Sequence, residues 1–241
     1  MSKEKNKDTV IQHKITAVNE INSLIDEFIK DDLMKADKFS YWLEDYSKFL
    51  KYEKEFNAKK LKRYKRGEII KAHLGFNVGS EEGGLHYCMV LDKENNLSSP
   101  VVTVIPLTSL KSKNKIKSLR KGELYIGNDL FNTLETKAKL LLSSTGEELI
   151  NLTQRAHNSN TIEKSELLEV QQRLNSIKNI QDELNKMKTG SIALIGQITT
   201  ISKIRIYTPK TKYDVLSNVR LPSNTLDLID TEIQNLFIGK K

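Results

Sequence analysis

The sequence predicts an α+β fold, in which a small β-rich core is joined to long helices. Residues 66–111 and 190–207 contain short runs of alternating apolar and β-branched residues, separated by Gly, Pro and Asn turns. In contrast, residues 10–56 and 134–187 place apolar side chains three and four positions apart, the period of an amphipathic helix. Because the two patterns occupy separate stretches of the chain, the α+β class is favoured.

The composition describes a basic protein with a modest core. The 241 residues include 39 Lys and Arg against 31 Asp and Glu, a formal net charge of +8, and only 38% are hydrophobic. A basic balance favours contact with nucleic acid or with an acidic protein. No apolar run approaches the length of a membrane span, and the polar N-terminus does not read as a signal peptide. We therefore expect a cytoplasmic protein without membrane association.

Residues 10–56 are expected to form a helical hairpin or one long bent helix, since the first 66 residues contain no Gly or Pro. The polar break Lys30-Asp31-Asp32 predicts a turn or a kink between two amphipathic segments. A basic connector at 59–66 then leads into the β region. It is either a solvated linker or a contact for an RNA backbone.

The next segment predicts strands at 67–74, 85–91 and 101–107, with a glycine-punctuated loop at 75–84. In this loop, Gly83 and Gly84 are expected to permit a positive φ or a close approach of backbones. Cys88 is the single cysteine and lies in an apolar strand pattern, which predicts a buried, unreactive thiol.

The second half of the chain predicts helices followed by a return to β structure. The expected elements are a short strand at 123–126, a helix from 134, a loop at 153–160, a helix ending near 187, strands at 191–200 and 203–207, and a final helix after Pro222. Asn160 and Glu163 form a candidate N-cap pair. The predicted inner face of the last helix consists of Leu226, Ile229, Ile233, Leu236 and Phe237.

Three pieces of sequence resemble one known family. They are Gly79-Ser80-Glu81-Glu82 with the two following glycines, the strand end Pro106-Leu107-Thr108-Ser109, and GQITTISK at 196–203. Their order resembles the MazF/PemK (Kid) family of toxin endoribonucleases. The resemblance implies an SH3-like small β-barrel of the CcdB/MazF type, here with an added helical lobe.

The resemblance covers about half of the chain and suggests how the chain is divided. The expected parts are an N-terminal helical extension at 1–62, a barrel formed by 63–132 with 188–241, and an inserted helical hairpin at 133–187. Because both helical additions carry apolar stripes that need partners, we expect 10–56 and 134–187 to pack together beside the barrel.

The resemblance also implies an activity and partners. The family's reaction is attack of a ribose 2′-OH on the adjacent phosphate, which leaves a 2′,3′-cyclic phosphate and a free 5′-OH. The protein is thus expected to be the toxin of a toxin–antitoxin system that cleaves single-stranded mRNA, without a metal or another cofactor. The implied partners are single-stranded RNA, an acidic antitoxin protein and a second copy in a homodimer.

The resemblance assigns site residues, with three departures from the family pattern: His86, Gly196 in place of an acidic residue, and the helical additions. Thr108 matches the catalytic threonine, but His86 occupies the position of the catalytic arginine. Three interpretations of His86 follow. It acts as an acid/base group or a phosphate ligand, or the nuclease activity of the protein is weakened. In the third, His86 is structural and another cation takes the place of the arginine. The candidate RNA-binding residues are Ser80, Glu81, Gln197, Thr199, Lys203 and Arg205.

Two other functions stay open because the arginine is absent. One is a nuclease-impaired module of the same fold that binds RNA or a protein. The other is a CcdB-like gyrase inhibitor, which the threonine of the strand end and the acidic loop argue against.

Overall fold

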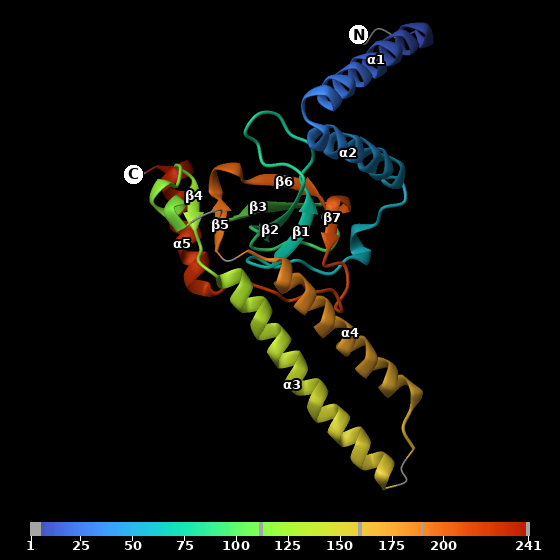
Figure 1. Cartoon of the computed structure of the whole chain (residues 1–241), viewed down its shortest axis with the longest axis vertical. Helices are drawn as coiled ribbons and strands as arrows, with labels where there is room; N and C mark the ends of the chain where they lie inside the picture. Colours follow the sequence, from blue (N-terminus) through green and yellow to red (C-terminus); the bar gives the residue numbers. More distant parts are fainter. Residues whose placement is uncertain (1–5, 111–112, 159–160, 189, 240–241) are drawn as a thin grey trace. The chain divides into compact units, whose positions relative to one another are not determined.

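The computed structural model describes residues 6–110, 113–158, 161–188 and 190–239, and the chain divides into two compact units (Figure 1). The first unit comprises residues 1–55 and the second comprises residues 56–241. Each unit has its own internal packing.

The first unit consists of two helices, α1 (Lys7–Asp31) and α2 (Leu33–Tyr52). The predicted break between them is confirmed at Asp32. The Asp32 carboxylate accepts a hydrogen bond from the backbone N–H of Lys35 at 3.0 Å and so caps α2. The rings of Phe28 and Phe39 meet edge to face, with centroids 5.9 Å apart. The hairpin buries little, and α1 has no fully buried residue.

The second unit is built on one antiparallel sheet of seven strands. They are β1 (Ile69–His73), β2 (Leu85–Val90), β3 (Val101–Ser109), β4 (Glu123–Tyr125), β5 (Ser191–Leu194), β6 (Thr199–Ser202) and β7 (Ile206–Thr208). The order is β4-β5-β3-β2-β1-β7. The long strand β3 pairs with β6 along its first half and with β5 along its second half. Within the described strands, no pairing joins β4 to β7, so the sheet is not closed, although it is consistent with an SH3-like fold.

Both faces of this sheet are covered, as the predicted strand patterns require. Successive residues of a strand point to opposite faces, so Met89 and Ile105 enter one core while Cys88 and Val104 enter the other. The first core also contains residues of the long helices, such as Leu134. Cys88 is fully buried, which confirms the prediction for this thiol.

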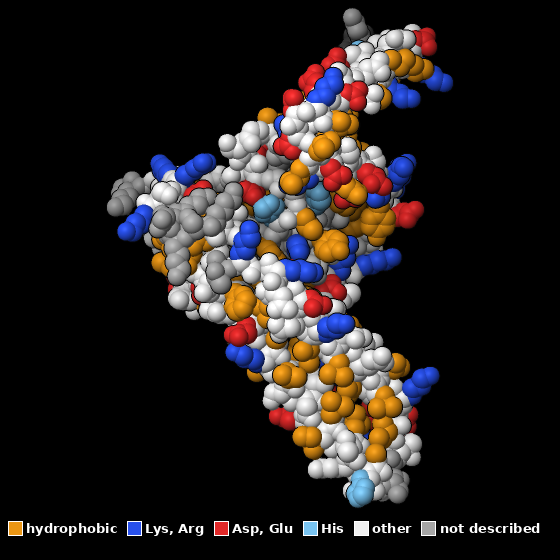
Figure 2. Space-filling model, viewed as in Figure 1, with side chains coloured by type: hydrophobic (Ala, Val, Ile, Leu, Met, Phe, Trp, Pro, Cys, Tyr) orange, Lys and Arg blue, Asp and Glu red, His pale blue; other side chains and the backbone are white. Residues whose placement is uncertain are grey.

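The helices α3 (Asp129–His157) and α4 (Lys164–Lys186) run side by side as an antiparallel hairpin (Figure 1). The predicted start of the following loop, at residue 153, was wrong, because α3 continues to His157. Glu163, rather than Asn160, caps α4 in a capping box with Glu166, and Asn160 lies outside the described residues. Figure 2 shows hydrophobic side chains exposed along this hairpin.

The C-terminal segment is more broken than predicted. Short 3-10 turns at Ile195–Gln197 and Lys203–Arg205 divide it into three strands in place of two. The last helix, α5 (Ser223–Ile233), continues into a π-helical turn at Gln234–Ile238. Leu226 and Ile229 are buried as predicted, whereas Phe237 is 57% exposed. The π turn changes the angular step between residues and so moves Phe237 off the inner face.

Among the helices that the structure describes, none combines the length and the apolar composition needed to cross a bilayer.

Candidate functional site

The loop between β1 and β2 has its shape because of two glycines. Gly84 has φ +84°, a region that side chains rarely enter, and its N–H donates to the Gly75 carbonyl at 2.6 Å. A Cβ on Gly83 would lie 2.7 Å from the same Gly75 oxygen. Both predicted uses of glycine are therefore present: the positive φ at Gly84 and the close approach at Gly83.

A hollow of about 630 Å³, called here the loop hollow, lies between this loop and the segment that follows β5. Gln197 connects its two sides, because its Oε1 accepts from the Glu82 N–H at 2.5 Å and its Nε2 donates to the Ser80 carbonyl at 3.2 Å. Five of the six predicted RNA-binding residues line it: Ser80, Glu81, Gln197, Thr199 and Arg205. The fold thus gathers residues separated by more than a hundred positions.

A second hollow of about 410 Å³, called here the strand-end hollow, lies where β2 begins and β3 ends. His86 and Thr108, the predicted catalytic pair, both line it. The sheet register explains this placement. Tyr87 and Leu107 are the last paired residues at this end of the β2–β3 ladder, and His86 and Thr108 are the residues next to that pair.

The His86 ring lies between two oxygen acceptors. Its Nε2 is 3.0 Å from Oε1 of Glu82, and its Nδ1 is 3.4 Å from the carbonyl oxygen of Leu107. A neutral imidazole has one N–H, so only the doubly protonated ring can donate to both oxygens. Glu82 lines the loop hollow and His86 lines the strand-end hollow, so this contact is made between a lining residue of each. Glu82 belongs to the loop motif, but it is not among the site residues that the sequence predicts.

Helix α4 also reaches the strand-end hollow, through Glu183. Its carboxylate accepts hydrogen bonds from the hydroxyl of Tyr87 and from Nζ of Lys71, the latter at 2.9 Å. Burial acts to raise the pKa of Glu183, but these bonds hold that pKa below its ordinary value. Burial and the bond to Glu183 raise the pKa of Tyr87. The sequence does not predict this cluster. The spacing of apolar residues in α4 shows which face of the helix packs inward, but it does not show which residues Glu183 contacts.

Lys203 differs from the other predicted RNA contacts because it is 1% exposed and lines neither hollow. Its Nζ donates to the Asn96 carbonyl at 3.0 Å, and burial lowers its pKa, against the opposing effect of Asp92. The 3-10 turn at Lys203–Arg205 directs this side chain inward. The placement of Lys203 does not favour an RNA contact.

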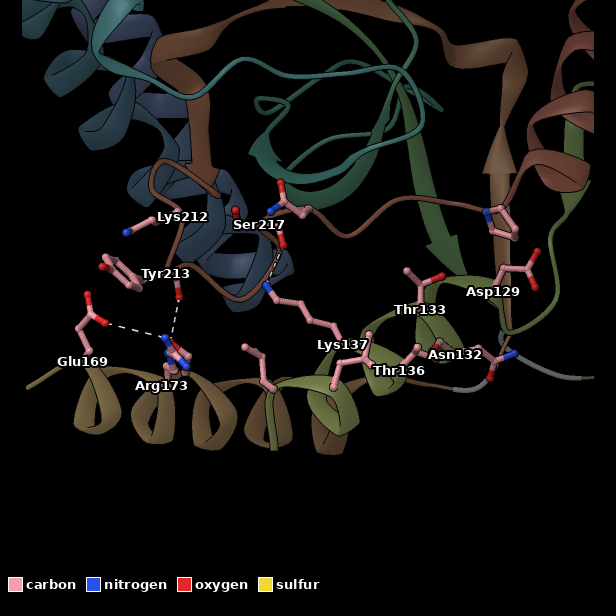
Figure 3. Close-up of a pocket in the computed structure, with 15 residues that line it drawn as sticks. Asp129, Asn132, Thr133, Thr136, Lys137, Glu169, Arg173, Lys212, Tyr213 and Ser217 are labelled. Atoms are coloured by element: carbon pink, nitrogen blue, oxygen red, sulfur yellow. Dashed lines mark hydrogen bonds and ion pairs between the residues drawn. The ribbon is translucent and has the colours of Figure 1, made fainter. Parts of the chain in front are cut away.

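A third hollow, of about 650 Å³, lies between α3, α4 and the segment around Ser217 (Figure 3). Lys137 Nζ donates to the carbonyls of Asp214, Val215 and Ser217, at 3.1, 2.7 and 2.8 Å. Burial lowers the pKa of Lys137 to about 8. None of the predicted site residues lines this hollow. Because the half-buried ammonium of Lys137 is satisfied by backbone oxygens, we interpret this hollow as a structural junction between the hairpin and the sheet.

The fold and the two hollows define the class: an α+β protein with an antiparallel sheet and polar residues gathered at one strand end. Comparison with protein families adds a sequence match. Residues 65–178 match the family described as PemK-like, MazF-like toxin of type II toxin-antitoxin system, which supports a MazF/PemK family toxin. The match confirms the resemblance found in the sequence around the loop and strand β3, while residues 190–237 lie beyond the matched range.

Comparison with solved structures adds a distant similarity. The chain resembles the crystal structure of MazF (Form-I) from Deinococcus radiodurans with a TM-score of 0.37 and 10% sequence identity, over 74% of this chain and 99% of that one. No curated protein matches the chain.

Proposed function

We propose that this toxin is a metal-independent endoribonuclease that cleaves single-stranded mRNA. The observation that carries the proposal is the shared hollow of His86 and Thr108, with Glu82 in contact with the imidazole. This arrangement offers a proton acceptor, a proton donor and a hydroxyl donor within one small region.

The reaction would follow from these three groups. The Glu82 carboxylate takes the proton of the ribose 2′-OH, whose oxygen attacks the adjacent phosphorus. The P–O5′ bond breaks, and the His86 imidazolium gives its proton to the leaving 5′ oxygen. The Thr108 hydroxyl donates a hydrogen bond to a non-bridging oxygen, where negative charge develops. The products are a 2′,3′-cyclic phosphate and a free 5′-OH.

The loop hollow would hold the bases beside the cleaved bond. Bases of a single strand are read on their edges, and carboxylates accept hydrogen bonds from the amino groups of bases. Glu81 and Gln197 line the loop hollow with acceptors of this kind, and Arg205 adds a cation for a phosphate. Ser80 and Thr199 complete this proposed surface.

The family match and the charge of the protein also support proposed partners. A type II system pairs the toxin with a protein antitoxin, and the net charge of +8 favours an acidic one. We further propose that the protein works as a homodimer in the cytoplasm.

A binding-only module is the second candidate, favoured by one observation. Position 86 carries a histidine engaged with Glu82, so the hollow has no guanidinium to fix a phosphate with two parallel hydrogen bonds.

The test is incubation of the purified protein with a long single-stranded RNA, with and without a chelator, followed by mapping of the cut ends. We expect cutting in both conditions and cyclic phosphate ends. His86→Ala and Thr108→Ala should each lower the rate by about 10²-fold or more. Thr103→Ala is the control, since this threonine is also on β3 but lines neither hollow. Wild-type protein that binds RNA but never cuts would establish the binding module. Full activity in both variants would refute the site.

A further inference from the structure

The charges around the strand-end hollow are not balanced. Its charged lining residues are Lys71, His86, Glu183, Lys186 and Lys188. Lys71 is paired with Glu183, and His86 is paired with Glu82. Within the described part of the chain, Lys186 and Lys188 form no ion pair. The excess positive charge of this hollow therefore comes from these two lysines.

Both lysines belong to the end of α4, and the fold holds that end against the hollow. Lys186 is the last residue of α4 and Lys188 follows two positions later. One turn earlier, Glu183 is bonded to Lys71 on β1 and to Tyr87 on β2, while Leu184 is buried in the core. The helix end is thus anchored from two sides. The lysine side chains themselves remain exposed at the rim, where an approaching phosphate can reach them.

The chemistry of the hollow needs such charges. When an alkoxide attacks a phosphodiester, negative charge increases on the non-bridging oxygens, and cations placed beforehand stabilise that state most. An imidazolium already bonded to a carboxylate supplies little net charge. An ammonium on a four-carbon stem is a compact point charge that can follow those oxygens.

We propose that Lys186 and Lys188 are the phosphate-binding cations of the strand-end hollow. The hairpin α3–α4 is then part of the nuclease site, because its end supplies the positive charge that position 86 does not. This inference rests on the proposed function, since it takes RNA as the ligand of the hollow.

The experiment compares two double variants of the full chain that lose the same charge. Lys186→Met with Lys188→Met removes the rim lysines. Lys164→Met with Lys178→Met removes two exposed lysines of α4 that do not line the hollow. Binding of a fluorescent single-stranded DNA oligonucleotide, which has no 2′-OH to attack, is measured by anisotropy from 50 to 200 mM salt. Cleavage of a matching RNA is measured in parallel.

In the rim variant, the slope of log affinity against log salt should become shallower by about 0.7 for each lysine removed. Each phosphate contact with a single strand contributes about that much to the slope, because it releases counterions. It should also lower kcat/KM at least about tenfold. Lys186→Arg with Lys188→Arg should keep both values near wild type, as should the control variant. Circular dichroism of all variants monitors folding.

Equal effects in the rim and control variants, or none in either, would overturn the inference while the proposed nuclease stands. Wild-type protein that neither binds the oligonucleotide nor cuts the RNA would instead refute the proposed function, and the inference would fail with it.

Discussion

At the scale of single residues, the candidate site depends on the surroundings of His86. A lone imidazole on a strand is most often a surface group. Here it contacts a carboxylate at one nitrogen and a backbone carbonyl at the other, and Thr108 lies on the neighbouring strand. Two oxygen atoms, one at each nitrogen, hold the orientation of the ring. The residue that orients His86 is Glu82, and its removal is the direct test of this reading.

Glu82→Ala should lower RNA cleavage by about 10²-fold, because it removes the proposed proton acceptor and the group that orients His86. Glu82→Gln, which can still accept a hydrogen bond but cannot take the proton, should be nearly as slow. The measurement is initial cleavage rate with saturating RNA. Glu81→Ala, which removes a proposed base contact from the same loop, should instead raise KM and leave this rate near wild type, since Glu81 contacts the backbone N–H of Val78 and not His86. Equal losses at the two glutamates would contradict the separate roles.

Cys88 gives a second prediction at this scale. Burial, with the nearby carboxylate of Glu82, raises the pKa of this thiol to about 12. The reactive thiolate is thus scarce in the folded protein at pH 8. Labelling by a disulfide reagent should be slower than in the urea-unfolded protein by about 10³-fold or more. Rapid labelling of the folded protein would show that β2 opens readily.

At the scale of elements, the hairpin α3–α4 is attached to the sheet at more than one point. Lys137 on α3 donates to three carbonyls around Ser217, and Glu183 on α4 bonds to β1 and β2. A helix packed only by an apolar stripe can slide or rotate. These polar contacts have fixed geometry, so they define where the end of α4 lies.

Glu183→Ala should lower the free energy of unfolding by about 1–3 kcal/mol, because it leaves a half-buried ammonium and a half-buried hydroxyl without their acceptor. Glu183→Gln should lose less, since its amide oxygen still accepts. Urea unfolding followed by circular dichroism provides the measurement. Glu135→Ala on α3 removes an exposed pair with Lys139 and should change stability very little. A Glu183→Ala protein as stable as wild type would show that packing alone places α4.

At the scale of the whole molecule, the chain is two compact units joined near residue 55. Both hollows and all the candidate site residues lie in the second unit, residues 56–241. That unit has its own two-sided core. Tyr64, close to its beginning, is fully buried and donates its hydroxyl proton to the Pro209 carbonyl at 2.8 Å.

A protein that begins at residue 56 should therefore fold cooperatively, with a Tm within about 4 °C of the corresponding transition in the full chain. It should keep its RNA cleavage. A second truncation that begins at Glu68, and so also removes Tyr64, should be much less stable, because it leaves a void in the core. Thermal unfolding by calorimetry distinguishes these outcomes. An unfolded or aggregated 56–241 fragment would show that the first 55 residues are required for the fold.

The sequence by itself determined the features that depend on local periodicity and local backbone geometry. These include the α+β class, the strands around Cys88, the helix break at Asp32 and the need for glycine at Gly83 and Gly84. Each follows from a few neighbouring residues, whose side-chain period or φ requirement is visible in the chain. The family resemblance then selected His86 and Thr108, which line the same hollow in the structure.

Only the tertiary structure decided which distant groups meet. The contact of Gln197 with the loop near Ser80 and that of Glu183 with Tyr87 join segments about a hundred residues apart. The inward turn of Lys203 depends on the 3-10 turn before β7. No local pattern specifies these contacts, because they follow from how β3 divides its pairing between β5 and β6 and from where α4 packs on the sheet.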